Sequence, residues 1–324
     1  MATISVLDLM MIGEDKTYTD TLDDAVMLAR HVEQHGLQRY WIAEHHDLPG
    51  IASSATTLLI SHLAAATSHL RVGAGGIMLP NHSPLMVAEQ FATLETLYPG
   101  RIDLGLGRAA GAAGPSILAL RGDASERDFE KDIDQLSDYL LDNGSQPVRG
   151  IPGTHKVPLW LLGSSMHSAD LAARRGLPYS FASHFAPHFL QKAVAHYRAN
   201  FQPSSVLDMP YVIAGANVIA ADTEQEAQFH ASSHFHWVNL LHQGRPGLLP
   251  RPQEGYLQRL SEIERHGLQQ SMAYSAVGDT NQVGDWLRQF IELTQADEVI
   301  IDARIHDPVA RCRSYQLAAE SLAG

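Results

Sequence analysis

The sequence predicts a single domain over residues 1–324, folded as a (β/α)₈ TIM barrel, and three observations lead to this fold class. Short β-rich runs alternate with longer amphipathic runs, which is typical of a parallel sheet. Eight such pairs fit within 324 residues, a length common for closed α/β barrels. Runs such as Pro158-Leu-Trp-Leu-Leu162 are apolar throughout, as expected for strands covered on both faces.

Each predicted strand is followed by a predicted helix. Strands are predicted at Thr3 to Leu9, Gln38 to Ala43, Leu70 to Met78, Arg101 to Gly107, Val157 to Leu162, Tyr179 to Ala182, Tyr211 to Ala220 and Glu298 to Asp302. Helices are predicted at Thr21 to Gly36, Ser54 to Ser68, Pro84 to Tyr98, Ser125 to Asp142, Ser165 to Gly176, Pro187 to Phe201, from Thr223, and Pro308 to Leu322. Gly36 is a typical C-terminal stop and Pro84 a typical first helical residue.

The seventh unit is too long for one helix. Ala221 to Asp297 leaves room for more than one helix, and Gln243 to Gln253 is rich in proline and glycine. We therefore expect an insertion between the seventh helix and the eighth strand.

Composition restricts the partners. Lys and Arg total 23 against 36 Asp and Glu, a net charge of −13, which disfavours nucleic acid and anionic membranes. The single cysteine, Cys312, cannot form an internal disulfide. We see neither a signal peptide nor an apolar run long enough to span a bilayer, and expect a cytoplasmic protein.

Barrel enzymes place their chemistry at the C-terminal ends of the strands. The second predicted strand ends in Ala43-Glu44-His45-His46-Asp47, a carboxylate beside two imidazoles. This pattern suits acid/base work or metal ligation, and equally a structural hydrogen-bond network. Adjacent strand residues point to opposite faces, so the two histidines cannot easily share a metal, and we predict no metal site.

Glycines mark the ends of the third and fourth strands. Gly75 and Gly76 would let a planar group approach the backbone, or form a bulge at the barrel rim. Gly105, Gly107 and Gly111 superficially resemble a dinucleotide fingerprint. We reject that match because the residues that follow are too rich in glycine and proline to open a helix directly, and no second strand with a terminal acid follows.

The fourth and fifth strands suggest a phosphate site. Arg108 follows the fourth strand and is either a phosphate ligand or part of a surface salt bridge. After Gly163 and Ser164, a helix begins with hydroxyls at Ser165 and Ser168, which gives an anion cradle or an ordinary N-cap. Neighbouring strands bring these groups together, which favours the phosphate interpretation.

Three histidines, His230, His234 and His236, lie on the seventh predicted helix. The i, i+4 pair could hold a metal, but no carboxylate or cysteine is placed to complete a site. We therefore expect a solvated histidine-rich face.

Several of these segments together resemble the luciferase-like flavin monooxygenases, in particular a bacterial luciferase-like oxidoreductase subgroup. The resemblance extends from the first strand to about Ala186 and more weakly beyond. It is carried by Tyr40-Trp-Ile-Ala-Glu-His-His46, Val72-Gly-Ala-Gly-Gly-Ile-Met-Leu-Pro80, Ala88-Glu-Gln-Phe-Ala-Thr-Leu-Glu95, Pro99-Gly-Arg-Ile-Asp-Leu-Gly-Leu-Gly-Arg108 and Pro158-Leu-Trp-Leu-Leu-Gly-Ser-Ser165.

The resemblance implies an FMN site. Arg108 matches the family's phosphate-binding arginine, and Ser165 and Ser168 match hydroxyl residues at the start of the phosphate-binding helix. Gly75 and Gly76 match a pair whose cis peptide lies against the flavin ring.

The resemblance also implies a reaction. His45 matches the family's acid/base histidine near the reduced flavin. The implied enzyme takes FMNH₂ from a separate flavin reductase, reacts with O₂ to give a C4a-peroxyflavin, and oxidises a small organic substrate as a paired-donor monooxygenase. Gly107 stands where bacterial luciferase has a reactive cysteine, and Ser164 where it has a glutamate. These departures weaken the implication of light emission and of an aldehyde substrate, but leave the flavin site intact.

Three alternatives stay open. The barrel could carry FMN without turnover, or use the deazaflavin F420 in place of FMN. A metal-dependent hydrolase using His45, His184 and His306 ranks last, because these residues lack metal-ligand spacing.

The sequence also suggests a homodimer. The helices Ser54 to Ser68 and Pro84 to Tyr98 carry apolar residues over more than one face, where a helix outside a barrel needs one apolar stripe. The resemblance implies a two-fold dimer through these helices. The alternative is that the Leu and Ala content reflects helix propensity alone. The apolar residues are Leu58, Leu59, Ile60, Leu63, Leu85, Val87, Phe91, Leu94 and Leu97.

Overall fold

The computed structural model describes residues 2–112, 114–122, 127–141, 144–153 and 156–323. In that part of the chain eight parallel strands form a closed ring, because β6 pairs with β7 as well as with β5. The predicted (β/α)₈ barrel is confirmed. Its strands are β1 (Thr3–Asp8), β2 (Arg39–Ile42), β3 (Arg71–Met78), β4 (Ile102–Gly107), β5 (Leu159–Gly163), β6 (Tyr179–Phe181), β7 (Val212–Ala220) and β9 (Glu298–Asp302).

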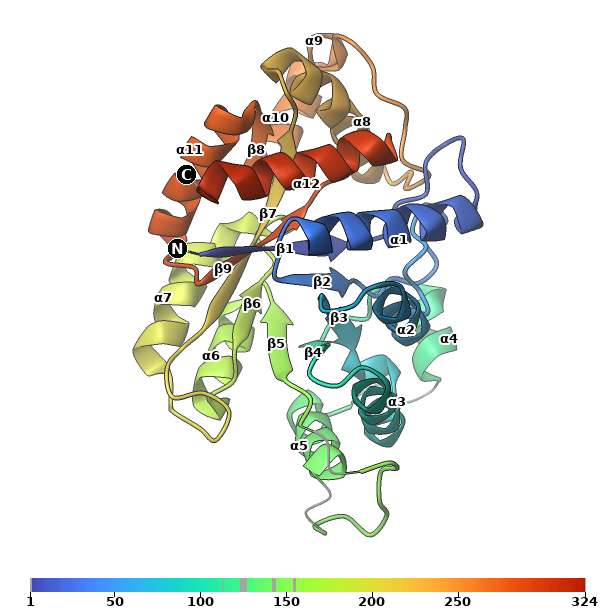
Figure 1. Ribbon diagram of the computed structural model, residues 1–324, viewed down its shortest axis with the longest axis vertical. Helices are drawn as coiled ribbons and strands as arrows, with labels where there is room; N and C mark the ends of the chain where they lie inside the picture. The colour runs from blue at the N-terminus through green and yellow to red at the C-terminus, as the bar shows by residue number, and fades with distance from the viewer. Residues whose placement is uncertain (1, 113, 123–126, 142–143, 154–155, 324) are drawn as a thin grey trace.

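Helices surround this ring (Figure 1). They are α1 (Tyr18–Gln34), α2 (Thr56–Ala66), α3 (Pro84–Leu97), α5 (Phe129–Leu141), α6 (Met166–Arg175), α7 (Leu190–Asn200), α8 (Glu224–His242), α11 (Thr280–Thr294) and α12 (Pro308–Ala323). The predicted bounds Ser125 and Asp142 of the fourth helix lie outside the described residues. Short helices that we did not predict separately are η1 (Leu79–Asn81), α4 (Pro115–Arg121) and η2 (Pro187–Phe189).

The expected insertion follows α8. It contains α9 (Tyr256–Arg259), α10 (Glu262–Ser271) and an additional strand, β8 (Ser275–Gly278), before α11. β8 pairs only with the last residues of β7, Asn217 to Ala220, and so lies outside the ring. Four residues of sequence Ser-Ala-Val-Gly are too short to show a strand period, which is why the sequence did not predict β8.

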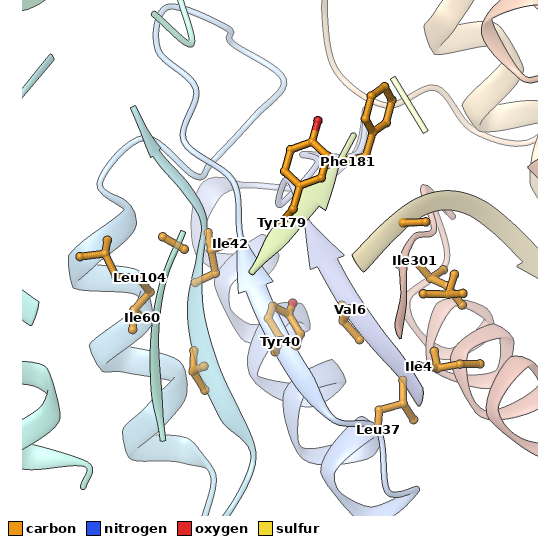
Figure 2. Packing of buried hydrophobic residues seen from close by; sticks show 14 of the residues in the cluster. Ile4, Val6, Leu37, Tyr40, Ile42, Ile60, Leu104, Tyr179, Phe181 and Ile301 are labelled. Carbon is orange, nitrogen blue, oxygen red and sulfur yellow. The ribbon is translucent and has the colours of Figure 1, made fainter. Parts of the chain in front are cut away.

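Two of the three apolar cores follow from the alternation of side chains along the strands, and the third lies between α8 and the insertion. The larger core lies between strands and helices and includes Tyr40, Ile42 and Leu104 (Figure 2). The smaller core fills the barrel lumen and includes Trp41 and Trp160. Side chains alternate along a strand, so every second residue counted from Trp41 or Trp160 also faces the lumen.

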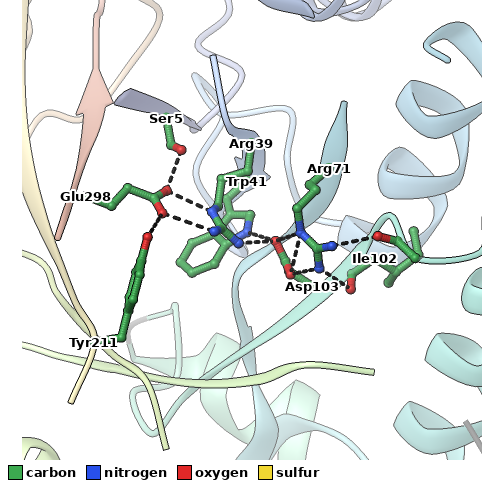
Figure 3. Close-up of polar contacts among 9 residues, drawn as sticks. Ser5, Arg39, Trp41, Arg71, Ile102, Asp103, Tyr211 and Glu298 are labelled. Atoms are coloured by element: carbon green, nitrogen blue, oxygen red, sulfur yellow. Dashed lines mark hydrogen bonds and ion pairs between the residues drawn. The ribbon is translucent and has the colours of Figure 1, made fainter. Parts of the chain in front are cut away.

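An ion network lies in the lumen near the N-terminal ends of the strands (Figure 3). Arg39 donates to Asp103 at 2.7 Å and to Glu298 at 2.8 Å, and its guanidinium lies 4.6 Å from the Trp160 ring centroid. Trp41 Nε1 also donates to Asp103, at 3.1 Å. These buried charges pair with one another. We therefore expect the active site at the opposite end of the barrel, where the strands have their C-terminal ends.

Candidate active site

His45 faces the lumen directly after β2. Trp41 and Ala43 belong to the lumen core, and His45 continues the same alternation. Its Nδ1 is buried without a hydrogen-bond partner among the described residues. Burial, aided by the Arg304 cation, lowers the pKa of His45 to about 4. The ring is therefore neutral at pH 7.

Glu44 points the other way and is 1% exposed. Its carboxylate accepts hydrogen bonds from the backbone N–H of Met78 and from His46 and His82, each at 2.9 Å, and from Asn81 at 3.2 Å. Burial alone would raise the pKa of Glu44, but these hydrogen bonds outweigh burial and lower it. Glu44 and His46 thus form the structural network considered above, whereas His45 is left free for other work.

Glycines lie in the C-terminal halves of β3 and β4, at Gly75, Gly76, Gly105 and Gly107. The Gly75–Gly76 peptide bond is cis, as the resemblance implied. A Cβ added at Gly75 would lie 2.9 Å from Leu7 Cδ1, and one at Gly76 would lie 2.6 Å from the Gly105 carbonyl oxygen. Only glycine fits at Gly76, where a Cβ would meet backbone, whereas a Cβ at Gly75 would crowd the Leu7 and Trp41 side chains.

Arg108 lies just past the end of β4. Its side chain is exposed and has no hydrogen-bond or ion-pair partner in the described part of the chain, so the salt-bridge alternative receives no support there. The β4–β5 register pairs Leu106 with Leu161, which carries Arg108 level with Gly163. The backbone of Arg108 therefore lies at the level of the residues that precede α6.

Ser165 is the N-cap of α6. Its hydroxyl accepts from the Ser168 N–H at 3.4 Å, and Ser168 Oγ donates to the Ser165 carbonyl at 2.8 Å. A Cβ at Gly163 would lie 2.3 Å from Ser168 Oγ, so glycine is required there. Ser164 is half-buried between them. The N-cap alternative is correct, and it is compatible with anion binding because a helix start still leaves N–H groups free.

The ring order divides the C-terminal end of the barrel into two arcs. β2 and β6 are separated by three strands in either direction, so they lie on opposite sides. The arc through β3, β4 and β5 carries the glycines, Arg108 and the start of α6. The arc through β7, β9 and β1 carries Asn217 and Asp302. His45 and His184 follow the two boundary strands.

The sequence alone did not identify the polar groups of the second arc. Asp302 ends β9, is 1% exposed and accepts from Arg304 at 2.7 Å. Arg304 in turn lies over the Trp237 ring, 4.6 Å from its centroid. Burial alone would raise the pKa of Asp302, but Arg304 and the neighbouring histidines lower it. Position at a strand end was the signal available for Asp302, whereas Asn217 lies within β7.

The prediction of a solvated histidine face on α8 is wrong. His234 is 1% exposed, and burial lowers its pKa to about 3. His236 packs against Tyr256 with 5.0 Å between ring centroids, and His230 lies within 3.7 Å of Glu226. Tyr256 of the insertion covers His236, whereas His234 lies close to Asp302, Arg304 and His184 at the end of the barrel. These contacts are distant in sequence, so the sequence pattern could not show them.

The insertion covers the end of the barrel above β1 and β2. Leu249 donates its N–H to the Ile12 carbonyl at 2.7 Å, and Trp237 Nε1 donates to the Gly247 carbonyl at 3.0 Å. A Cβ at Gly50 would lie only 1.9 Å from the Gly247 oxygen. This close contact fixes the segment as a wall of the second arc.

His306 pairs with Asp15 at 2.8 Å. Within the described ranges no three His, Cys, Asp or Glu side chains are grouped so as to hold a metal ion. The hydrolase alternative therefore gains no geometric support.

Comparison with known proteins identifies the family. The chain matches the family model for luciferase-like monooxygenases over residues 3–141 and 141–297. The chain belongs to the luciferase-like monooxygenase family. None of the helices in the described ranges has the length and apolar character needed to cross a membrane.

Three similar proteins cover nearly the whole chain. A luciferase-like monooxygenase of Escherichia coli K12 is 46% identical over 98% of this chain and 96% of its own length. The N-acetyl-S-alkylcysteine monooxygenase of Bacillus subtilis 168 is 32% identical, covering 99% of this chain and 98% of its own. The crystal structure of apo-MsnO8 has a TM-score of 0.88 and 36% identity, covering 100% of this chain and 99% of that one.

More distant structures share the fold with different cofactors. The oxygenating constituent of 3,6-diketocamphane monooxygenase, solved with FMN, has a TM-score of 0.72 at 16% identity and covers 100% of this chain and 98% of its own. An F420-dependent secondary alcohol dehydrogenase has a TM-score of 0.65 at 15% identity and covers 99% of both chains. Family membership therefore supports an oxidoreductase, while the fold admits both flavin types.

Proposed function

We propose that this chain is the oxygenating component of a two-component flavin monooxygenase, which uses reduced FMN and O₂ to oxidise a small organic substrate. The observation that carries the proposal is the first arc. Arg108, which has no side-chain partner among the described residues, follows β4 at the level of the start of α6, beside the glycines of β3 and β4. A flat ring with an anionic tail needs this combination of a bare surface and a cationic, dipolar end.

The residues present fit FMN. Arg108 would bind the phosphate through charge-assisted hydrogen bonds, with N–H groups and hydroxyls of Gly163, Ser164, Ser165 and Ser168 around it. Gly75 and Gly76 would lie against the ring system, since a side chain at either position would collide with its neighbours.

Bound reduced FMN would supply the electrons that activate O₂. The protein's own contribution lies in position and exclusion of water. His45, neutral at pH 7 and facing the lumen, is placed to hold or move a proton at its ring nitrogen. The insertion, fixed against Ile12 and Gly50, would keep water from the substrate side.

F420 is the second candidate cofactor, because the F420-dependent dehydrogenase has the same fold. An FMN carrier without turnover would need no acid/base group, and the lumen-facing His45 argues against it. We further propose that the chain acts as one domain in a cytoplasmic homodimer and receives its reduced flavin from a separate reductase.

Reconstitution tests the proposal. The purified protein is titrated with FMN and F420, and then supplied with isotopically labelled O₂, a generic flavin reductase and a metabolite library that includes N-acetyl-S-alkylcysteines. Labelled oxygen in a product, with FMN only, is the expected result. Product formation with F420 only would establish the alternative cofactor, and flavin binding without any product would support the carrier.

A further inference from the structure

A histidine at the edge of the second arc, His184, has no role in the proposed function. His184 follows β6 and so lies across the barrel from His45, which follows β2. Both residues are only half-buried, so part of each stays accessible to a bound molecule. The two imidazoles also lie close enough to influence each other's charge.

Gly215 makes room for the His184 ring inside the barrel. Ile213 lies in the lumen core, so Gly215 and Asn217 on the same strand also face the lumen. A Cβ at Gly215 would lie 2.3 Å from His184 Nδ1. The loop that carries the ring is held in place, because Asn217 Nδ2 donates to the His184 carbonyl at 2.9 Å and Ser183 Oγ donates to the Gly215 carbonyl at 2.5 Å.

This contact determines which ring nitrogen of His184 can donate a hydrogen bond. Nδ1 is buried against the Gly215 backbone and has no partner among the described residues. A buried N–H without an acceptor is costly, so the ring proton belongs on Nε2. Burial also keeps the ring neutral, since it lowers the pKa of His184 to about 4. His184 therefore presents one neutral N–H donor.

The charges around His184 cancel. Asp302 and Arg304 form a buried pair, and both His45 and His184 are neutral at pH 7. A carboxylate or ammonium group placed here would lose hydration without a free counter-ion. An uncharged oxygen needs only the donor.

We propose that His184 is a substrate-anchoring residue whose Nε2–H donates to an uncharged oxygen acceptor, a carbonyl or hydroxyl group, on the organic substrate. The substrate then lies on the second arc, between His45 and the insertion, with the flavin on the first arc. This inference rests on the proposed function, because it places the substrate opposite the flavin site.

A set of small probes with one ring tests the anchor. Acetophenone and benzyl alcohol carry an uncharged oxygen, whereas benzoate, benzylamine and ethylbenzene carry an anion, a cation and no polar group. Binding to FMN-loaded protein is measured by calorimetry. We expect the two uncharged oxygen probes to bind about tenfold more tightly than the other three, the ratio that one additional hydrogen bond provides.

Variants locate the effect. His184→Phe should remove this preference, His184→Gln should restore much of it because its amide N–H can donate, and the distant surface variant His69→Phe should match the wild type. Tighter binding of benzoate, no binding of any probe, or an unchanged preference in His184→Phe would overturn the proposal. FMN binding is measured first, and a protein that binds no FMN would contradict the proposed flavin function. In that case the same probes, tested on the protein without FMN, still decide the role of His184.

Discussion

Glu44 and His45 are neighbours in sequence but work on opposite sides of the barrel wall. The Glu44 carboxylate fixes the segment after β3 through Met78 and His82, while the His45 ring faces the lumen with an unpartnered Nδ1. Strand alternation causes the separation. It also makes the two residues separable by mutation, since one should affect stability and the other turnover.

His45→Ala should slow product formation by about 10²- to 10⁴-fold, the usual worth of general acid–base catalysis. FMN affinity should be unchanged, because His45 lies outside the phosphate cradle. Steady-state rates and flavin fluorescence titration measure the two effects, with the exposed His69→Ala as control. A wild-type rate in His45→Ala would return this histidine to a structural role.

Glu44→Ala should lower the free energy of unfolding by about 1–3 kcal/mol, since the Met78 N–H, His46 and His82 lose a buried acceptor. Chemical denaturation measures the loss, and Glu44→Gln, which keeps one acceptor oxygen, should lose less. Because folding lowers the Glu44 pKa below its ordinary 4.5, the carboxylate stabilises the protein above that pH. The difference between wild type and Glu44→Gln should therefore shrink as the pH falls below 4.5. A pH-independent difference would show that the charge of Glu44 is irrelevant.

Arg108→Ala should weaken FMN binding by about 1.5–3 kcal/mol, the range for hydrogen bonds to charged groups. The control variant Arg288→Ala removes the same charge from the outer helix α11 and should leave the affinity for FMN unchanged. Flavin fluorescence titration at constant salt compares the two variants. Equal affinity in Arg108→Ala and wild type would remove Arg108 from the phosphate site.

Strand ends explain why much of the first arc could be predicted from sequence. Arg108 and Ser165 each follow a strand whose apolar run is easy to recognise, and the Gly75–Gly76 pair lies in the C-terminal half of β3. The sequence pattern is enough to bring these residues together, because β3, β4 and β5 are neighbours both in the chain and in the ring. The cis peptide came from the resemblance and not from the pattern.

The second arc depends on contacts that are distant in sequence. His184 is accommodated by the space at Gly215, and His234 is buried close to Asp302, Arg304 and His184 at the end of the barrel. A histidine on a helix gives no local sign of such burial, and β8 is too short to show a strand period. The burial of these histidines therefore depends on tertiary packing, which the sequence pattern does not show.

Acid should destabilise the protein through three histidines whose pKa values lie below the ordinary one. Burial lowers the pKa of His45 and His184 to about 4 and that of His234 to about 3, against an ordinary value of 6.5. As the pH falls below 6.5 these histidines become protonated in the unfolded chain but stay neutral in the folded chain. The free energy of unfolding must therefore fall. Each such group contributes a slope of up to about 1.4 kcal/mol per pH unit.

Denaturation at several pH values between 6.5 and about 4 measures that slope. His234→Gln should reduce it by about one proton, because glutamine does not titrate. An equal slope in the variant would mean that His234 is protonated in the folded state as well.

The proposed homodimer rests on fewer residues than the sequence suggested. Most apolar side chains of α2 and α3 are used by the core, and among those we named only Leu58 and Leu97 are exposed, at 73% and 58%. Met86 adds a further 58% exposed side chain on α3. The two helices are joined by a hydrogen bond from Thr57 to Gln90, which makes their outer faces one surface.

Leu58→Lys combined with Met86→Lys should therefore shift a dimer toward monomer by placing like charges across a two-fold interface. Sedimentation equilibrium at micromolar concentration measures the mass. Ile263→Lys on α10, where the side chain is 85% exposed, is the matched control and should leave the mass unchanged. A wild-type monomer would defeat the dimer itself. A dimer that persists in the double variant would keep the assembly but place its interface on other helices, since apolar contacts carrying two buried lysines on each copy would not survive at that concentration.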